Sequence, residues 1–140
     1  MDLCGHATLA TAFVVFSFLT PDREKITFQT KKSGSLHVAR QGDLLVMDFP
    51  ADASAPIDPP PELTAALGME PIETRQGMDI LALLPSERDV AALTPDMALL
   101  KQIETRGIIA TAPGTDCDFV SRFFAPREGI DEDPVTGSAH

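Results

Sequence analysis

The fold is decided by a stretch near the start of the chain, CGHATLATAFVVFSFL, which covers residues 4–19. Residues 9–19 carry almost no polar side chain, and a helix that is apolar all round has no face that is stable in water. As a helix they would be about 17 Å long, too short to cross a bilayer. Unbonded N–H groups of a first helical turn can hold an anion, and Gly5 would let it approach closely. The stretch therefore predicts a buried central helix whose N-terminus is open to a ligand.

The rest of the chain predicts a sheet that curls around this helix. Alternating apolar residues predict strands at 25–30, 36–38 and 44–49, with a tight hairpin at 41–43. A proline-rich connector at 50–61 follows. Further helices are expected at 62–68, 86–93 and 94–106, and further strands at 71–74, 79–84, 108–112 and 118–125, before a loop at 126–131. Because a sheet must cover the apolar helix, we expect an α+β fold.

Composition narrows the classes of partner. The formal net charge is −10, and no cluster of Lys or Arg is longer than Lys31-Lys32. Nucleic acid and anionic membranes need a basic surface, so neither is an expected partner. The two cysteines, Cys4 and Cys117, form neither a disulfide framework nor a zinc motif, and we expect no metal. The residues before the apolar run include Asp2 and no cation, unlike a secretory signal, so a cytoplasmic location is expected.

The last residues, EDPVTGSAH at 132–140, contain the strongest candidate site. Proline disfavours the helical region for the residue before it, so Asp133 is expected to be extended. Thr136, Gly137 and Ser138 then offer hydroxyl and N–H groups at a helix start. A carboxylate beside such a cradle suits proton transfer on a carboxylate-bearing substrate. The same residues would equally form a plain helix cap, and their spacing leaves both interpretations open.

Two residues at the first helix start also have alternative roles. His6 could hydrogen-bond a substrate carboxylate, or it could only cap its own helix. Cys4 could be a nucleophile or a proton carrier, because a helix N-terminus lowers a thiol pKa, or it could be a small buried residue. We interpret Cys117, which has no partner in its turn, as structural.

Two long motifs resemble the signatures of the phenazine-biosynthesis PhzF-like family. They are MDLCGHATLA at 1–10 and DFVSRFFAP at 118–126 with GIDEDPVTGSAH at 129–140. The resemblance implies a diaminopimelate-epimerase-like fold, in which two similar α+β halves each wrap a sheet around a central helix and the active site lies in the cleft between them. It covers essentially all of this chain, which in turn covers only the middle of the family. Residues 1–105 would form most of the first half, and residues 106–140 the crossover and the start of the second.

The resemblance also implies an activity and a set of site residues. Its best understood members are cofactor-free isomerases that move a proton on a cyclic hydroxylated amino acid. It implies a small carboxylate or amino-acid-like substrate for this chain, no cofactor, and a homodimer. Catalytic roles fall to Asp133 and His6, and substrate-binding roles to Gly5, Thr136, Gly137 and Ser138.

One departure from the family pattern leaves alternatives open. The family's general acid/base is a Glu four residues before the position of Cys4, which would be the residue immediately before Met1. We therefore expect little or no catalysis from these 140 residues alone. The alternatives are a non-catalytic binding or interaction module and an amino-acid epimerase assisted by Cys4.

Overall fold

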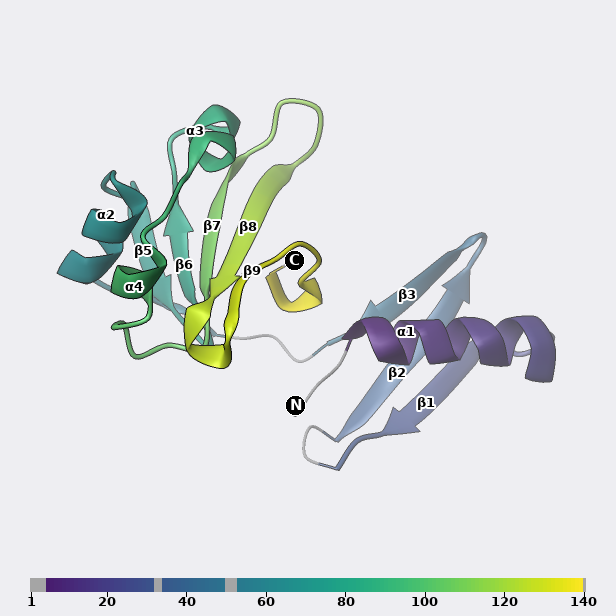
Figure 1. Cartoon of the computed structure of the whole chain (residues 1–140). Coiled ribbons are helices and arrows are strands. Elements are labelled where there is room, and N and C mark those ends of the chain that lie inside the picture. Colours follow the sequence, from purple (N-terminus) through teal and green to yellow (C-terminus); the bar gives the residue numbers. More distant parts are fainter. Residues whose placement is uncertain (1–4, 32–33, 50–52, 140) are drawn as a thin grey trace. The chain divides into compact units, whose positions relative to one another are not determined.

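A computed structural model describes residues 5–31, 34–49 and 53–139, with the backbone only at Ser138 (Figure 1). The chain divides into two compact units, Met1–Ala51 and Asp52–His140.

The first unit is a helix on a three-stranded antiparallel sheet. The helix α1 (Gly5–Val14) continues directly into the π-helix η1 (Val15–Leu19), which the Thr20 N–H closes by donating to the Val15 carbonyl at 2.8 Å. The strands, in the order β1-β2-β3, are β1 (Lys25–Gln29), β2 (Ser35–Gln41) and β3 (Leu44–Asp48). Gly42 has a φ of 61° in the β2–β3 turn, a conformation that glycine adopts without steric cost. The predicted meander and its hairpin are confirmed.

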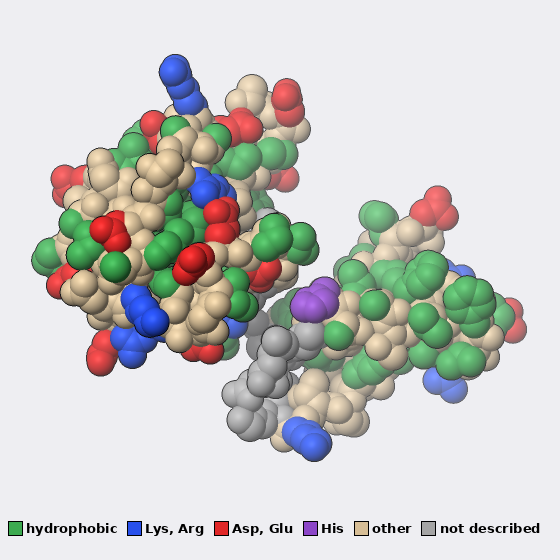
Figure 2. Space-filling model, in the orientation of Figure 1, with side chains coloured by type: hydrophobic (Ala, Val, Ile, Leu, Met, Phe, Trp, Pro, Cys, Tyr) green, Lys and Arg blue, Asp and Glu red, His purple; other side chains and the backbone are tan. Residues whose placement is uncertain are grey.

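The helix is buried on one face only. Ala12 and Phe16 are buried with Val38 of β2, and residues of β1 and β3 pack around them. On the outer face, however, Phe13 is 56% exposed and Phe18 is 73% exposed. Figure 2 shows hydrophobic side chains gathered along this helix. The burial predicted on all sides is therefore not seen in the described residues. Three strands span only about 10 Å, roughly the diameter of one helix, so they cover one side of it.

The second unit is a mixed six-stranded sheet in the order β4-β5-β6-β7-β8-β9. Its strands are β4 (Ala55–Pro56), β5 (Glu73–Gln76), β6 (Ile80–Leu83), β7 (Ile108–Pro113), β8 (Phe119–Ala125) and β9 (Ile130–Asp133). Only β6 and β7 pair in parallel. Its helices are α2 (Pro61–Leu67), α3 (Glu87–Ala92), α4 (Met97–Leu100) and two short 3-10 helices, η2 (Pro126–Glu128) and η3 (Gly137–Ala139).

The three α-helices lie on one face of this sheet (Figure 1). They enclose the main core, whose largest fully buried side chains include Leu63, Leu84, Leu100, Ile108 and Phe124. The opposite face carries a smaller cluster of Ile109, Phe123 and Ala125, against which Ala139 of η3 packs. η3 is thereby attached to the sheet.

Several predicted boundaries differ from the structure. The helix predicted at 94–106 begins as expected after Asp96, but α4 ends at Leu100. The chain turns there because Gly107 must lie beside β6, where its carbonyl accepts the Ile80 N–H at 3.0 Å. The loop predicted at 126–131 instead contains η2 and the start of β9.

The compact units do not coincide with the predicted halves. They divide between residues 51 and 52, whereas the predicted boundary at 105/106 falls between the paired strands β6 and β7. The prediction concerned two halves of a longer family fold, and it stays a prediction. None of the helices in the described part of the chain is both long and apolar enough to span a membrane.

Candidate functional site

Three of the predicted site residues, Asp133, Thr136 and Gly137, lie together at the end of β9 and in the turn that follows, in the second unit. The Asp133 carboxylate accepts two hydrogen bonds, from the Val135 N–H at 3.3 Å and from the Thr136 hydroxyl at 2.6 Å. The Ala139 N–H donates to the Thr136 carbonyl at 3.0 Å and closes η3. Gly137 is exposed, and a Cβ built on it would meet no atom within 4 Å. The extended backbone predicted at Asp133 is confirmed.

This turn serves a structural purpose in its own right. A carboxylate that accepts the N–H two residues on and the hydroxyl three residues on organises the turn locally. These bonds form a turn ahead of η3, and both the helix-cap and the site interpretations of the sequence stay predictions. The site interpretation needs more than this geometry, although the open backbone at Gly137 leaves space for a ligand beside the carboxylate.

Glu132, one residue before Asp133, is held by an ion pair that sequence reasoning missed. Arg122 Nε and Nη2 donate to the two Glu132 carboxylate oxygens at 2.7 Å and 2.8 Å. This hydrogen bonding holds the pKa of Glu132 below its ordinary value and raises the pKa of Arg122. The Glu132 carboxylate is therefore held in place by Arg122. The two residues are ten positions apart in the sequence, and only the pairing of β8 with β9 brings them together.

A β-bulge sets the direction of both carboxylates. Phe123 pairs with Asp133 and Ala125 pairs with Ile130, so two residues of β9 oppose Phe124 alone. Bulges of this kind redirect side chains and are frequent beside functional sites. Glu132 consequently faces the helix-covered side with Arg122, and Asp133 faces the other side.

The other predicted site residues, Gly5 and His6, lie in the first unit at the start of α1. His6 is exposed. A Cβ on Gly5 would lie 3.1 Å from Cζ of Phe49, so the absence of a side chain there has a packing reason besides any ligand. Cys4, His140 and the side chain of Ser138 lie outside what the structure describes.

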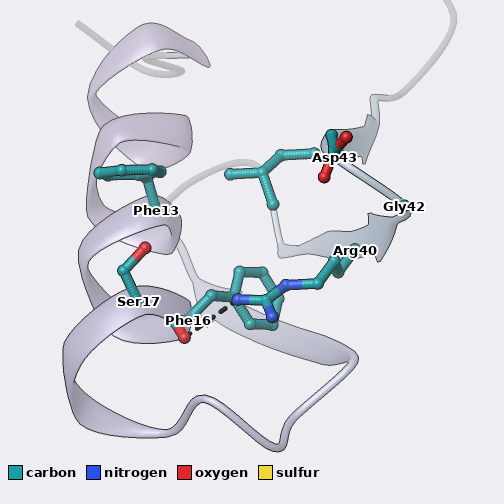
Figure 3. Close-up of a pocket in the computed structure, with 7 residues that line it drawn as sticks. Phe13, Phe16, Ser17, Arg40, Gly42 and Asp43 are labelled. Atoms are coloured by element: carbon teal, nitrogen blue, oxygen red, sulfur yellow. Dashed lines mark hydrogen bonds between the residues drawn. The ribbon is translucent and has the colours of Figure 1, made fainter.

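The first unit also contains a cavity of about 200 Å³ where α1 continues into η1. Its lining, shown in Figure 3, comes from the helix and from the β2–β3 hairpin: Phe13, Phe16, Ser17, Arg40, Gly42, Asp43 and Leu45. The Arg40 guanidinium lies 5.1 Å from the centre of the Phe16 ring, and its Nη2 donates to the Phe16 carbonyl at 3.0 Å. These two contacts of Arg40 fasten the C-terminal end of the helix to β2. A second, open hollow in the same unit includes His6, Leu9 and Phe13.

A metal centre cannot be assigned from this geometry. Across residues 5–31, 34–49 and 53–139, no three His, Cys, Asp or Glu side chains form a group that could hold a metal ion. The expectation that the protein needs neither metal nor cofactor stays a prediction.

Comparison with known proteins assigns the family. The model of the PhzC-PhzF family, described as phenazine biosynthesis-like protein, matches residues 1–140. The chain belongs to this family. The PhzF resemblance drawn from the two sequence motifs is thereby confirmed.

Relatives and solved structures support the assignment. The chain is 49% identical over 139 residues to an uncharacterized isomerase of Pseudomonas aeruginosa, covering 99% of this chain and 53% of that protein. A second uncharacterized isomerase of the same organism is 48% identical over 140 residues, with 100% and 54% covered. The crystal structure of a PhzF family protein of Enterococcus faecalis matches with a TM-score of 0.90 at 45% identity, over 100% of this chain and 54% of that one.

This PhzF-like chain spans about half the length of the relatives that it matches. Its α+β fold agrees with PhzF structures over that half.

Proposed function

We propose that this PhzF-like chain is part of a cofactor-independent isomerase, which moves a proton on a small carboxylate or amino-acid-like substrate. The observation that carries the proposal is the position of Asp133, whose carboxylate is oriented by Val135 and Thr136 beside an open backbone at Gly137. The relatives named isomerases support the reaction class.

The proposed roles follow from the chemistry of each group. Asp133 takes part, alongside the family's acid/base Glu, in moving a proton from carbon next to an activating group of the substrate to another position. Thr136, Gly137 and Ser138 bind the substrate's polar groups through hydroxyl and N–H donors. Gly5 binds the substrate in the same way at the start of α1. His6, which is exposed to solvent there, has a catalytic role in which it hydrogen-bonds the substrate carboxylate.

The proposed fold is the diaminopimelate-epimerase-like one, in which a sheet wraps around a central helix. The outer face of α1 and η1, with Phe13 and Phe18 exposed, is the surface that such a sheet would cover. A homodimer remains part of the proposal.

Deuterium incorporation tests the proposed function. Because we expect little or no catalysis from these 140 residues alone, the assay uses the longer protein of which they are proposed to be part. That protein would be incubated in D2O with a panel of cyclic hydroxylated amino acids, and exchange of carbon-bound hydrogen followed by NMR. We expect Asp133→Asn to slow exchange by about 10²- to 10⁴-fold, the usual contribution of a general acid or base. The matched control is Asp131→Asn, which removes an exposed carboxylate from the same strand and should leave the exchange rate unchanged.

Two results would contradict the proposal. Exchange by the wild-type protein that survives Asp133→Asn would remove Asp133 from the reaction. No exchange with any member of the panel, in protein that binds those compounds, would favour the second candidate function, a non-catalytic binding module. The exposed apolar face of α1 and η1 favours that second candidate, since such a surface is typical of interaction sites. The Cys4-assisted epimerase stays a prediction, because Cys4 lies outside the described residues.

A further inference from the structure

Arg122 has four hydrogen-bond acceptors on two different elements. Besides the two bonds to Glu132, its Nη1 donates to the Leu93 carbonyl at 2.7 Å and to the Val90 carbonyl at 3.2 Å. Those carbonyls are at the end of α3, and the Val90 carbonyl also accepts the N–H of the C-cap residue Leu93 at 3.3 Å. The guanidinium also lies 5.0 Å from the centre of the Phe124 ring. Arg122 therefore ties β9 to the end of α3.

The tie is stiff for physical reasons. The paired guanidinium and carboxylate are planar groups joined by two parallel charge-assisted hydrogen bonds, the geometry that gives most directional restraint. The Arg122 side chain is only 25% exposed, and its aromatic neighbour limits its movement on one side. A lysine, with one point charge on a flexible stem, could not replace these contacts.

Glu132 directly precedes Asp133, so any movement of Glu132 moves Asp133. The bulge at Phe124 adds an unpaired residue to β9 at this place, which removes part of the backbone ladder that would otherwise hold the strand. The side-chain tie compensates for the missing ladder bonds. A misplacement of about 1 Å at a reacting group can cost about 10²-fold in rate.

We infer that Arg122 is a positioning residue, which acts through Glu132 to hold Asp133 in place for substrate. The inference rests on the proposed function for its consequence in catalysis. Its structural part, the restraint of the turn after β9, stands independently of any reaction.

Amide hydrogen exchange by NMR tests the restraint directly on the 140-residue chain. The reporters are the Val135 N–H, bonded to Asp133, and the Ala139 N–H, bonded to Thr136. We expect Glu132→Gln to speed exchange of both amides about tenfold, which is the effect of losing a hydrogen bond to a charged group. Amides of α3 should exchange at the wild-type rate, since Glu132→Gln leaves the α3 carbonyls with their Arg122 donor.

A matched control and a double variant separate positioning from general stability. Arg75→Lys removes a similar guanidinium, which bonds Glu73 at 2.7 Å and the Ser54 carbonyl at 2.9 Å. Arg75 lies on β5, three strands away from β8 in the sheet. Its substitution should leave the reporter amides unchanged. Arg122→Lys should speed them as Glu132→Gln does, and the double variant should be no faster than Arg122→Lys alone.

Three results would overturn the inference. The first is that the reporter amides of Glu132→Gln exchange at the wild-type rate. The second is that Arg75→Lys speeds their exchange as much as Glu132→Gln does. The third is that the effects of Arg122→Lys and Glu132→Gln on the exchange rates add in the double variant. Where the deuterium assay finds turnover, Glu132→Gln should lower kcat with little change in KM, and an unchanged kcat would refute the catalytic consequence. If the proposed function is wrong and the positioning role of Arg122 is right, Asp133→Asn would turn over substrate at the wild-type rate. The faster amide exchange in Glu132→Gln and Arg122→Lys would still be observed.

Discussion

Replacing Gly107 by alanine should destabilise the second unit through a steric clash with Phe123. A Cβ on Gly107 would lie 2.2 Å from Cζ and 2.5 Å from Cε2 of the Phe123 ring. Carbon atoms pack at about 3.5–4.0 Å, so the ring would have to move by about 1.3 Å or more. Phe123 is only 6% exposed, and the Arg106 guanidinium lies 5.7 Å from its ring centre. The ring has little space into which it can move.

The expected magnitude combines two opposing effects. Forcing extra volume into a packed core costs about 1–3 kcal/mol, and the tight contacts here favour the upper half of that range. Gly→Ala also reduces the freedom of the unfolded chain, which returns about 0.4–1 kcal/mol. We therefore expect Gly107→Ala to lower the free energy of unfolding by about 1–2.6 kcal/mol.

Urea denaturation is the assay. The chain contains no Trp or Tyr, so far-UV circular dichroism is the better probe than intrinsic fluorescence. With an m-value of about 1–3 kcal/mol/M, the transition midpoint should fall by about 0.3–2.6 M. Phe123→Leu, which shortens the clashing side chain, provides the control in a double-mutant cycle. The reasoning is refuted if Gly107→Ala stays within about 0.5 kcal/mol of wild type, or if the two substitutions add.

Three further predictions concern stability. Arg106→Leu should lower the free energy of unfolding by about 3 kcal/mol at neutral pH. The substitution leaves the Asp79 side chain, which is only 5% exposed, without its bidentate partner. A urea midpoint equal to that of wild type would contradict this prediction. Because Arg122 lowers the folded-state pKa of Glu132, their pair stabilises the fold above the ordinary value of 4.5, and this stability is lost as the pH falls through the lower folded pKa. Between neutral pH and about pH 3, Glu132→Gln should therefore lose less stability than wild type in urea titrations, and an equal loss would disprove the linkage. Asp96→Ala should cost about 1 kcal/mol in thermal unfolding, since the carboxylate caps α4 by accepting N–H bonds at 2.8 Å and 3.2 Å; an unchanged melting temperature would argue against the cap.

Local sequence signals predicted the elements that depend on near neighbours. Gly42 lies in the hairpin predicted at 41–43 and Gly68 ends the helix predicted at 62–68, and both have positive φ in the structure. The helix predicted at 86–93 begins with Ser86, which is its N-cap in the structure and whose Oγ accepts the Asp89 N–H at 3.3 Å. Each of these signals acts within four residues along the chain, so the sequence alone contains all the partners.

Signals that depend on distant partners were missed. The ion pair between Arg122 and Glu132 follows from the register of β8 and β9, which the bulge shifts by one residue. The early end of α4 follows from the pairing of β6 with β7, which requires the chain to turn back. Neither a periodicity nor a spacing in the sequence encodes such a register.

In the candidate site, too, the sequence predicted some features and left others open. The motif at 132–140 predicted an extended backbone at Asp133 ahead of a helix start, and the structure confirms the extended backbone. The bonds of Asp133 to Val135 and Thr136 come from the structure. What role Asp133 and His6 play toward a substrate stays a prediction, because a cap and a substrate cradle use the same local geometry.

By itself, the sequence determined the family and most of the local structure. The apolar period, the glycines and the two motifs are properties of neighbouring residues, and they predicted the meander, the helix starts and the PhzF resemblance. Only the tertiary structure decided how α1 is buried, since burial depends on how many strands reach the helix: Phe16 is 1% exposed and Phe18 is 73% exposed although both belong to one apolar run. It likewise decided that Glu132 is held by Arg122 while Asp133 faces the other side of the sheet. Packing and strand register join residues distant in sequence, and no local pattern records those contacts.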